Sequence, residues 1–199
     1  FTKKQEKILE DLERETHYKI LMPRMISGHL MGTFLQFISK MLHPKHILEI
    51  GTYTGYSAIC LASGLHKNGK LHTIEINPEL KEISTKYFKK ANLTNKIDLH
   101  IGDAKHIIPT LDILFDLIFI DADKKNYLHY YELAIEKTNK GGHILIDNVL
   151  WSGKVLHPAK SNDIETLEIQ KLNQKIQSDN RVENILLPIR DGLMICKIL

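Results

Sequence analysis

The chain has 199 residues, of which 43% are hydrophobic and 26% charged, and its formal net charge is +3. A chain of this length buries roughly 70% of the surface that it exposes when unfolded, so it needs no disulfide or structural metal to fold. Its apolar runs fall far short of the roughly 20 residues that cross a membrane, and its charge is low for a dedicated nucleic-acid-binding protein. The composition predicts a single domain over residues 1–199 with no membrane partner.

The two cysteines, Cys60 and Cys196, lie far apart, one in a helical pattern and one in a strand pattern. We expect both to be reduced and to pack as small apolar side chains. No signal-peptide pattern opens the sequence, which begins at Phe1. These features predict a protein of the reducing cytoplasm.

The N-terminal part predicts two helices. Residues 3–15 are charged with apolar residues on one side, which indicates an amphipathic helix. Pro23 interrupts this segment, Ser27 is expected to cap a second helix, and Pro44 closes it. We expect the helices of residues 1–44 to cover the functional site, and residues 45–199 to form a Rossmann-like core.

From residue 46 onward, short apolar runs alternate with helical patterns. The expected strands are 46–50, 70–74, 97–101, 115–120, 143–146, 182–187 and 193–198. The expected helices are 56–66, 78–91, 104–111, 126–137 and 165–177. Strand–helix alternation predicts a parallel sheet with helices on both faces. The last two strands must pair antiparallel, because the turn at Asp191-Gly192 leaves no room for a parallel crossover.

Ligands of open α/β sheets bind at the carboxyl ends of the strands. Gly51 and Gly55 follow the first strand and allow close backbone approach to a ligand, although their spacing is only part of the G-x-G-x-x-G pattern. Glu75 ends the second strand, where an acid can bind both ribose hydroxyls. The pattern predicts a nucleoside-containing cofactor, and a glycine turn followed by a solvated Glu is the alternative. Asp103 fits either an adenine contact or a helix N-cap.

Acidic residues also end the fourth and fifth predicted strands. Asp121 follows one strand, and Asp147 with Asn148 follows the next. Two carboxylates and one amide form an all-oxygen set, which suits Mg²⁺ or Ca²⁺ and not zinc. Three protein ligands leave three octahedral positions for water and substrate. The alternative is that these side chains cap helices or bind loop amides.

These residues together resemble the cation-dependent class I O-methyltransferases, the group that contains catechol and caffeoyl-CoA O-methyltransferases. The matching stretches are 48–57 (LEIGTYTGYS), 119–127 (FIDADKKNY), 147–153 (DNVLWSG) and 181–192. The resemblance covers residues 22–199 and looks closest to bacterial members. It implies a Rossmann-like sheet of seven mostly parallel strands, the last inserted antiparallel, and a homodimer.

The resemblance also implies residue roles, with S-adenosylmethionine as the cofactor. Asp123 would approach the cofactor's amino group, Ala104 would lie near the adenine, and Glu75 would hold the ribose. The residues that would contact the methionine part or shape its loop are Ser27, Glu49, Gly51, Tyr53 and Ser57. The implied metal ligands are Asp121, Asp147 and Asn148, with Asp121 also counted among the cofactor residues. Lys124 matches the lysine proposed as general base, and a solvated lysine is the alternative.

The expected reaction is methylation of one hydroxyl of a catechol-like small molecule, with Mg²⁺, Mn²⁺ or Ca²⁺ as the metal. Trp151 would form a wall for the aromatic ring, or simply pack under its loop, and Lys124 and Arg24 would lie near the substrate. One alternative is methylation of hydroxylated uridine in transfer RNA. The basic candidates for phosphate contacts are Arg24, Lys124, Lys125, Lys154, Lys160 and Arg190. Further alternatives are a noncatalytic nucleotide-binding module and an NAD-linked oxidoreductase, against which the incomplete glycine pattern argues.

Overall fold

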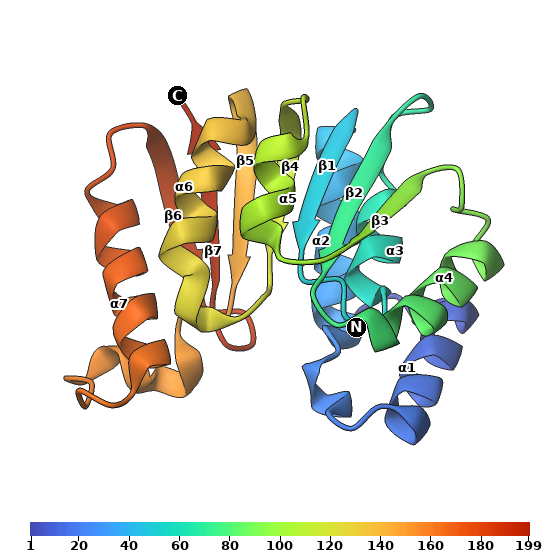
Figure 1. The fold of residues 1–199 in the computed structure, drawn as a ribbon, viewed down its shortest axis with the longest axis horizontal. Coiled ribbons are helices and arrows are strands. Elements are labelled where there is room, and N and C mark those ends of the chain that lie inside the picture. Colours follow the sequence, from blue (N-terminus) through green and yellow to red (C-terminus); the bar gives the residue numbers. More distant parts are fainter. The chain divides into compact units, whose positions relative to one another are not determined.

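The computed structural model describes residues 1–199 and divides them into two compact units, residues 1–103 and 104–199. The first unit contains three parallel strands in the order β3-β2-β1 (Figure 1). These strands are β1 (His46–Ile50), β2 (Lys70–Glu75) and β3 (Ile97–Ile101). Ile50 lies opposite Ile74, so the residues that follow β1 lie level with the end of β2.

Helices surround the strands of the first unit. They are α1 (Lys7–Lys19), α2 (Gly28–Leu42), α3 (Tyr56–Ala62) and α4 (Lys81–Lys90), with short 3₁₀ turns η1 (Pro23–Met25) and η2 (Pro78–Leu80). Helix α3 is buried along its whole length and packs on β2 and on α2. Helix α1 begins four residues later than predicted. Ser27 does precede α2, but the expected capping bond is wrong, because its side chain makes none and its backbone is already helical.

The second unit contains four strands in the order β4-β5-β7-β6. These strands are β4 (Phe115–Ile120), β5 (Thr138–Asp147), β6 (Val182–Leu187) and β7 (Leu193–Ile198). Strands β4 and β5 are parallel, whereas β7 pairs antiparallel with both β5 and β6, which confirms the predicted hairpin. Strand β5 starts five residues earlier than predicted, before Gly141-Gly142, where its register with β4 shifts.

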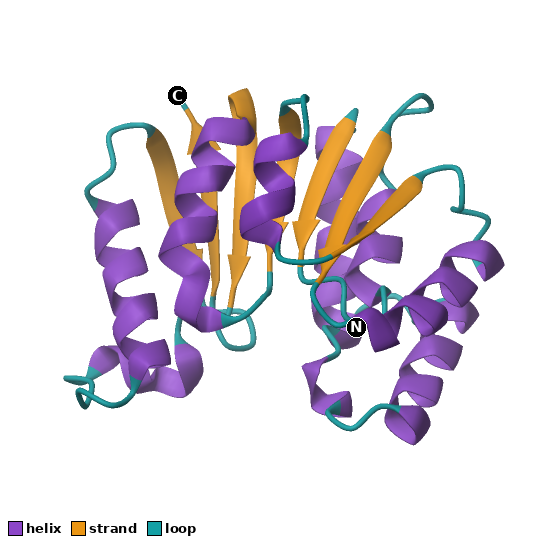
Figure 2. Cartoon of the chain, in the orientation of Figure 1, coloured by secondary structure: helices purple, strands orange, loops and turns teal.

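Three helices of the second unit lie in front of its strands in Figure 2. They are α5 (Ala104–Thr110), α6 (Tyr127–Lys137) and α7 (Ile164–Gln177), with 3₁₀ turns η3 (Lys124–Asn126) and η4 (Trp151–Leu156). Helix α6 packs on β4 and β5, and α7 packs on α6 and β6. Strand β4 is buried because five of its six residues are bulky and apolar. It carries Asp121 immediately after its end.

Two expectations from composition can be compared with the structure. Cys60 and Cys196 are both buried and unpaired in disulfides, as expected. None of the helices combines the length and the hydropathy that a membrane span requires.

Candidate active site

The loop after β1 has a backbone that favours glycine. Gly51, Tyr53 and Gly55 all have positive φ angles, of 101°, 50° and 92°. A Cβ atom at Gly55 would lie 2.6 Å from Cε1 of Phe88, so the loop turns into α3 only because no side chain stands there. The amide nitrogens of residues 51 and 52 both donate to the carbonyl of Ile74, which holds the loop against the end of β2.

Glu75 fixes this loop from the neighbouring strand. One carboxylate oxygen accepts the N–H of Tyr53 at 2.7 Å, and the other accepts the N–H of Asn77 at 2.9 Å. Burial raises the pKa of Glu75, and these backbone N–H groups oppose the rise. A carboxylate has about four lone-pair positions. Glu75 therefore retains acceptor capacity for the hydroxyls of a ribose.

Glu49 and Ser57 are both buried beside the same loop. Glu49 is fully enclosed in β1 and accepts a hydrogen bond from the hydroxyl of Thr73 at 2.5 Å. The Thr73 hydroxyl also contacts the hydroxyl of Thr52 in the loop. Ser57 lies in the first turn of α3. The structure thus brings Glu49, Gly51, Tyr53 and Glu75 close together at the ends of β1 and β2. Ser27 and Arg24 lie around η1 and the start of α2.

Asp121 and Asp147 lie at the carboxyl ends of paired strands. Ile120 of β4 is opposite Ile146 of β5, so the two acids occupy equivalent positions, and the predicted neighbourhood of these strands is confirmed. Burial, and then the negative charge of Asp121, raise the pKa of Asp147 to about 7. The backbone N–H of Asn148 donates to Asp147 Oδ1 at 2.8 Å, and Arg190 Nη1 lies 3.8 Å from Oδ2. This is a concentrated site of negative charge that a cation would stabilise.

Lys124 is buried beside these acids. Its ammonium donates to Asp121 Oδ1 at 3.1 Å, to the carbonyl of Ala122 at 3.1 Å and to the hydroxyl of Tyr127 at 2.5 Å. It also lies 5.9 Å from the ring centre of Trp151. The structure therefore shows a buried, hydrogen-bonded Lys124, in contrast to the alternative of a solvated lysine.

The hairpin turn between β6 and β7 supports the Trp151 loop. The amide nitrogens of Val149 and Leu150 donate to the carbonyls of Gly192 and Asp191, at 3.2 and 2.9 Å. The Asp191 carboxylate accepts the backbone N–H of Ser152. Trp151 itself has a positive φ of 48°, and its indole N–H is buried without a partner. The indole N–H is therefore a buried donor without an acceptor in the second unit.

The second unit also contains three further predicted site residues, Asp123, Ala104 and Asn148. Both oxygens of Asp123 accept hydrogen bonds, from Tyr130 at 2.6 Å and from Asn126 at 2.5 Å. Ala104 is buried at the start of α5. Asn148 adopts a left-handed backbone with φ 63°, which an asparagine tolerates.

Sequence reasoning missed the roles of Tyr127 and Asp191, and it placed Arg190 only among phosphate contacts. Tyr127 follows Lys124 by three residues, a helical spacing that brings side chains together and could have been noticed. Arg190 and Asp191 reach the site because β7 returns beside β5, which a hairpin signal alone does not reveal.

The comparisons with known proteins identify the family of the chain. The family model described as O-methyltransferase matches residues 2–199. The chain belongs to this O-methyltransferase family. Caffeoyl-CoA O-methyltransferase 2 of Eucalyptus globulus is 37% identical over 180 residues, which are 83% of this chain and 72% of that protein. Caffeoyl-CoA O-methyltransferase 1 of Arabidopsis thaliana is 34% identical, over 83% of this chain and 68% of that protein.

Solved structures of O-methyltransferases have a fold similar to that of this chain. The O-methyltransferase from Bacillus cereus, in complex with SAH, has a TM-score of 0.92 and 29% identity, covering 99% of this chain and 93% of that one. The O-methyltransferase TomG from Streptomyces achromogenes, in complex with SAM, has a TM-score of 0.90 and 26% identity, covering 98% and 91%. The fold is therefore that of the class I S-adenosylmethionine-dependent methyltransferases, as expected, and the protein is a methyltransferase enzyme.

Proposed function

We propose that this enzyme requires a divalent metal, Mg²⁺ first among the candidates, and methylates one hydroxyl of a small substrate with two adjacent oxygens. The observation that carries the proposal is the pairing of Asp121 with the buried Asp147 at the ends of β4 and β5. Burial first, and then the charge of Asp121, raise the pKa of Asp147, so a negative charge at this position is disfavoured unless a cation compensates it.

The residues present fit a hard cation. The donor set would be Asp121, Asp147 and the amide oxygen of Asn148, all of them oxygens. No three His, Cys, Asp or Glu side chains converge on one point, and the proposed set includes only two such side chains, both of them Asp. Substrate and water oxygens would complete the coordination. Lys124 now contacts Asp121 Oδ1, so this contact would loosen when the carboxylate turns to a cation.

A bound divalent cation lowers the pKa of a coordinated hydroxyl and fixes its orientation. Lys124 Nζ, once it has released a proton to solvent and become a neutral amine, would be the group that receives the hydroxyl proton, because it lies beside Asp121. Trp151 provides an aromatic wall near the same nitrogen. Glu75 would accept hydrogen bonds from the ribose hydroxyls of the cofactor, and the loop 51–55 would contact its methionine part. Asp123 is the proposed partner of the cofactor's amino group.

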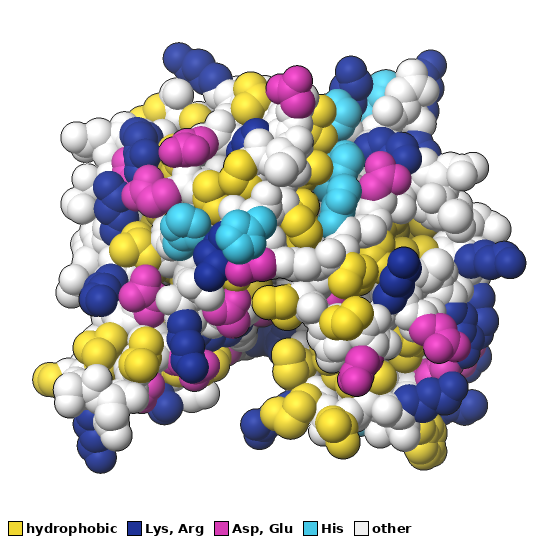
Figure 3. Space-filling model, viewed as in Figure 1, with side chains coloured by type: hydrophobic (Ala, Val, Ile, Leu, Met, Phe, Trp, Pro, Cys, Tyr) yellow, Lys and Arg dark blue, Asp and Glu magenta, His cyan; other side chains and the backbone are white.

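Two observations favour a small catechol-like substrate. The similar plant enzymes are named for caffeoyl-CoA, and a caffeoyl group carries two adjacent phenolic oxygens. On the face of the protein drawn in Figure 3, Lys and Arg are interspersed with Asp and Glu and form no single-sign patch. A transfer RNA substrate would need several phosphate contacts. Hydroxylated uridine in transfer RNA stays the second candidate, and a cytoplasmic homodimer stays an expectation.

The test is a methyl-transfer screen with S-adenosylmethionine and Mg²⁺. Small catechols, monophenols of the same size, unmodified transfer RNA and hydroxylated transfer RNA are compared in parallel, each with and without EDTA. We expect catechols to react, monophenols to fail, and EDTA to abolish turnover until Mg²⁺ or Mn²⁺ is restored. Equal rates with EDTA would reject the metal, and equal rates for monophenols would reject chelation of two oxygens.

A further inference from the structure

Tyr127 is the first residue of α6, and it lies next to the acidic pair of Asp121 and Asp147. Its side chain is fully buried. Its hydroxyl contacts Lys124 Nζ at 2.5 Å and the backbone carbonyl oxygen of Asp147 at 3.1 Å. A carbonyl oxygen only accepts, so the hydroxyl donates to Asp147 and must accept from Lys124. One hydroxyl therefore connects Lys124, in the segment after β4, to Asp147, the last residue of β5.

This connection distinguishes Tyr127 from the other partners of Lys124. An ammonium has three donors, and here their acceptors are Asp121, Ala122 and Tyr127. Asp121 and Ala122 both belong to the segment after β4. Tyr127 alone ties the lysine to β5. It also places its ring 4.6 Å from the lysine nitrogen, which adds a cation–π contact.

We propose that Tyr127 is a positioning residue of this methyltransferase, whose hydroxyl holds the Lys124 amine and the end of β5 in one fixed arrangement. The inference rests on the proposed role of Lys124 and adds to it the group that keeps the amine in place. If Asp121 turned to a cation, Lys124 would keep two of its three partners, Ala122 and Tyr127. Without the hydroxyl, the ammonium retains Asp121 as its charged partner and competes with the cation for that carboxylate.

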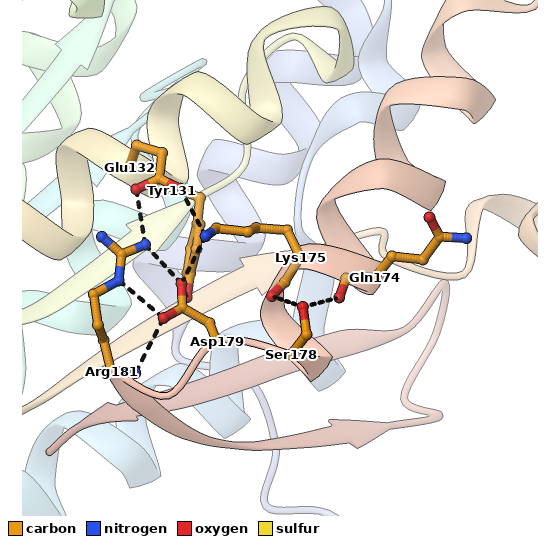
Figure 4. A network of polar contacts seen from close by, with 7 residues as sticks. All are labelled: Tyr131, Glu132, Gln174, Lys175, Ser178, Asp179 and Arg181. Atoms are coloured by element: carbon orange, nitrogen blue, oxygen red, sulfur yellow. Dashed lines mark hydrogen bonds and ion pairs between the residues drawn. The ribbon is translucent and has the colours of Figure 1, made fainter.

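The substitution Tyr127→Phe removes the hydroxyl and retains the buried ring. Tyr131→Phe is a matched control on the same helix, one turn later. Tyr131 is also fully buried, and its hydroxyl donates to Asp179 Oδ2 at 3.1 Å (Figure 4). Both variants lose one buried hydroxyl bond, so both should melt a few degrees lower, at roughly 2–4 °C per kcal/mol for a chain of this size.

Three measurements separate positioning from a structural role. With a methyl acceptor at saturation, we expect kcat of Tyr127→Phe to fall about 10-fold to 100-fold, the range for a displaced reacting group. KM for S-adenosylmethionine should stay unchanged. Mn²⁺ binding, followed by electron paramagnetic resonance without cofactor or substrate, should weaken in Tyr127→Phe and not in Tyr131→Phe. Equal kcat and equal Mn²⁺ affinity in the two variants would overturn the inference.

A double-mutant cycle with Lys124→Ala identifies the residue through which Tyr127 acts. If the hydroxyl works through the lysine, Tyr127→Phe lowers kcat in the native background and has no further effect on it in the Lys124→Ala background. Additive losses would overturn the inference and leave the proposed function intact. A Lys124→Ala enzyme with native kcat would instead reject the proposed role of Lys124, and the two failures are thereby distinguished.

Discussion

At the scale of single residues, the site depends on buried polar groups that retain unused bonding capacity. Glu75 accepts two backbone N–H bonds and still has free lone pairs. The indole N–H of Trp151 is buried without an acceptor. Leaving a buried donor unpaired costs about 1–3 kcal/mol. A bound ligand that supplies the missing hydrogen-bond partners would stabilise such groups most.

Glu75→Gln is predicted to weaken cofactor binding. The amide keeps the side-chain size, but it replaces a charged acceptor for the ribose hydroxyls. A hydrogen bond to a charged partner contributes about 1.5–3 kcal/mol, so the Kd of S-adenosylmethionine should rise roughly 10-fold to 100-fold. Calorimetric titration measures this. Glu79→Gln, at an exposed position four residues later, is the control and should bind normally. An unchanged Kd for Glu75→Gln would reject the ribose role.

Asp147→Ala is predicted to remove turnover while cofactor binding persists. The side chain faces Asp121, Arg190 and the N–H of Asn148. Its loss removes a proposed metal ligand and relieves the repulsion with Asp121. We expect Mn²⁺ binding to vanish and the Kd of S-adenosylmethionine to stay within the experimental error of the native value. Full Mg²⁺-dependent activity in this variant would contradict the ligand assignment.

At the scale of elements, one polar network fixes the junction between α7 and β6. Asp179 is almost fully buried and accepts hydrogen bonds from Tyr131 and from the backbone and guanidinium of Arg181 (Figure 4). Arg181 also bonds Glu132 of α6 at 2.8 Å. The network joins α6, α7 and β6, and so sets where the hairpin that carries Arg190 begins.

Asp179→Asn is predicted to destabilise the protein in a pH-dependent way. The bonds from Arg181 hold the pKa of Asp179 well below its ordinary 3.8. A depressed pKa means that the stabilisation is fully present above that ordinary value and is lost as the pH falls below it. At neutral pH we expect the variant to lose about 1–3 kcal/mol, and the difference from the native protein should shrink in acid.

The measurement for this prediction is the melting temperature of both proteins at neutral pH and at about pH 3. Glu183→Gln replaces an exposed carboxylate of β6 and serves as the control. If Asp179→Asn and Glu183→Gln have the same melting temperature at neutral pH, the stabilising role of the Asp179 network is wrong.

At the scale of the whole molecule, we expect charge to influence which substrates bind. The net charge is only +3, and three of the basic residues considered for phosphate contacts have acidic partners. Lys124 binds Asp121, and Arg190 faces Asp147. Lys154 pairs with Asp163 on the surface. Of the six candidates, Arg24, Lys125 and Lys160 remain for phosphate contacts.

Competition between a small catechol and hydroxylated transfer RNA is predicted to favour the catechol. Chelation by two oxygens supplies both orientation and acidity, so a catechol needs little further recognition. Its rate should change little between low and moderate salt, because few phosphate contacts are involved. A transfer RNA rate far above that of every catechol, falling steeply with salt, would contradict the small-molecule proposal.

The sequence by itself determined the alternation of strands and helices, the antiparallel hairpin and the acidic residues at strand ends. These follow from local periodicity and turn chemistry, which act within a few residues. Asp121 and Asp147 could be placed together because parallel neighbours end at one edge. Glu75 could be placed beside the glycine loop for the same reason.

Only the tertiary structure decided which distant groups complete the site. The insertion of β7 beside β5 brings the turn at Asp191 under the Trp151 loop, and no local pattern encodes that pairing. The burial of Tyr127 between Lys124 and the Asp147 carbonyl likewise depends on how α6 packs on β4 and β5. The missing capping bond of Ser27 has the same origin, because its helical backbone and burial, set by its surroundings, overrode a local preference.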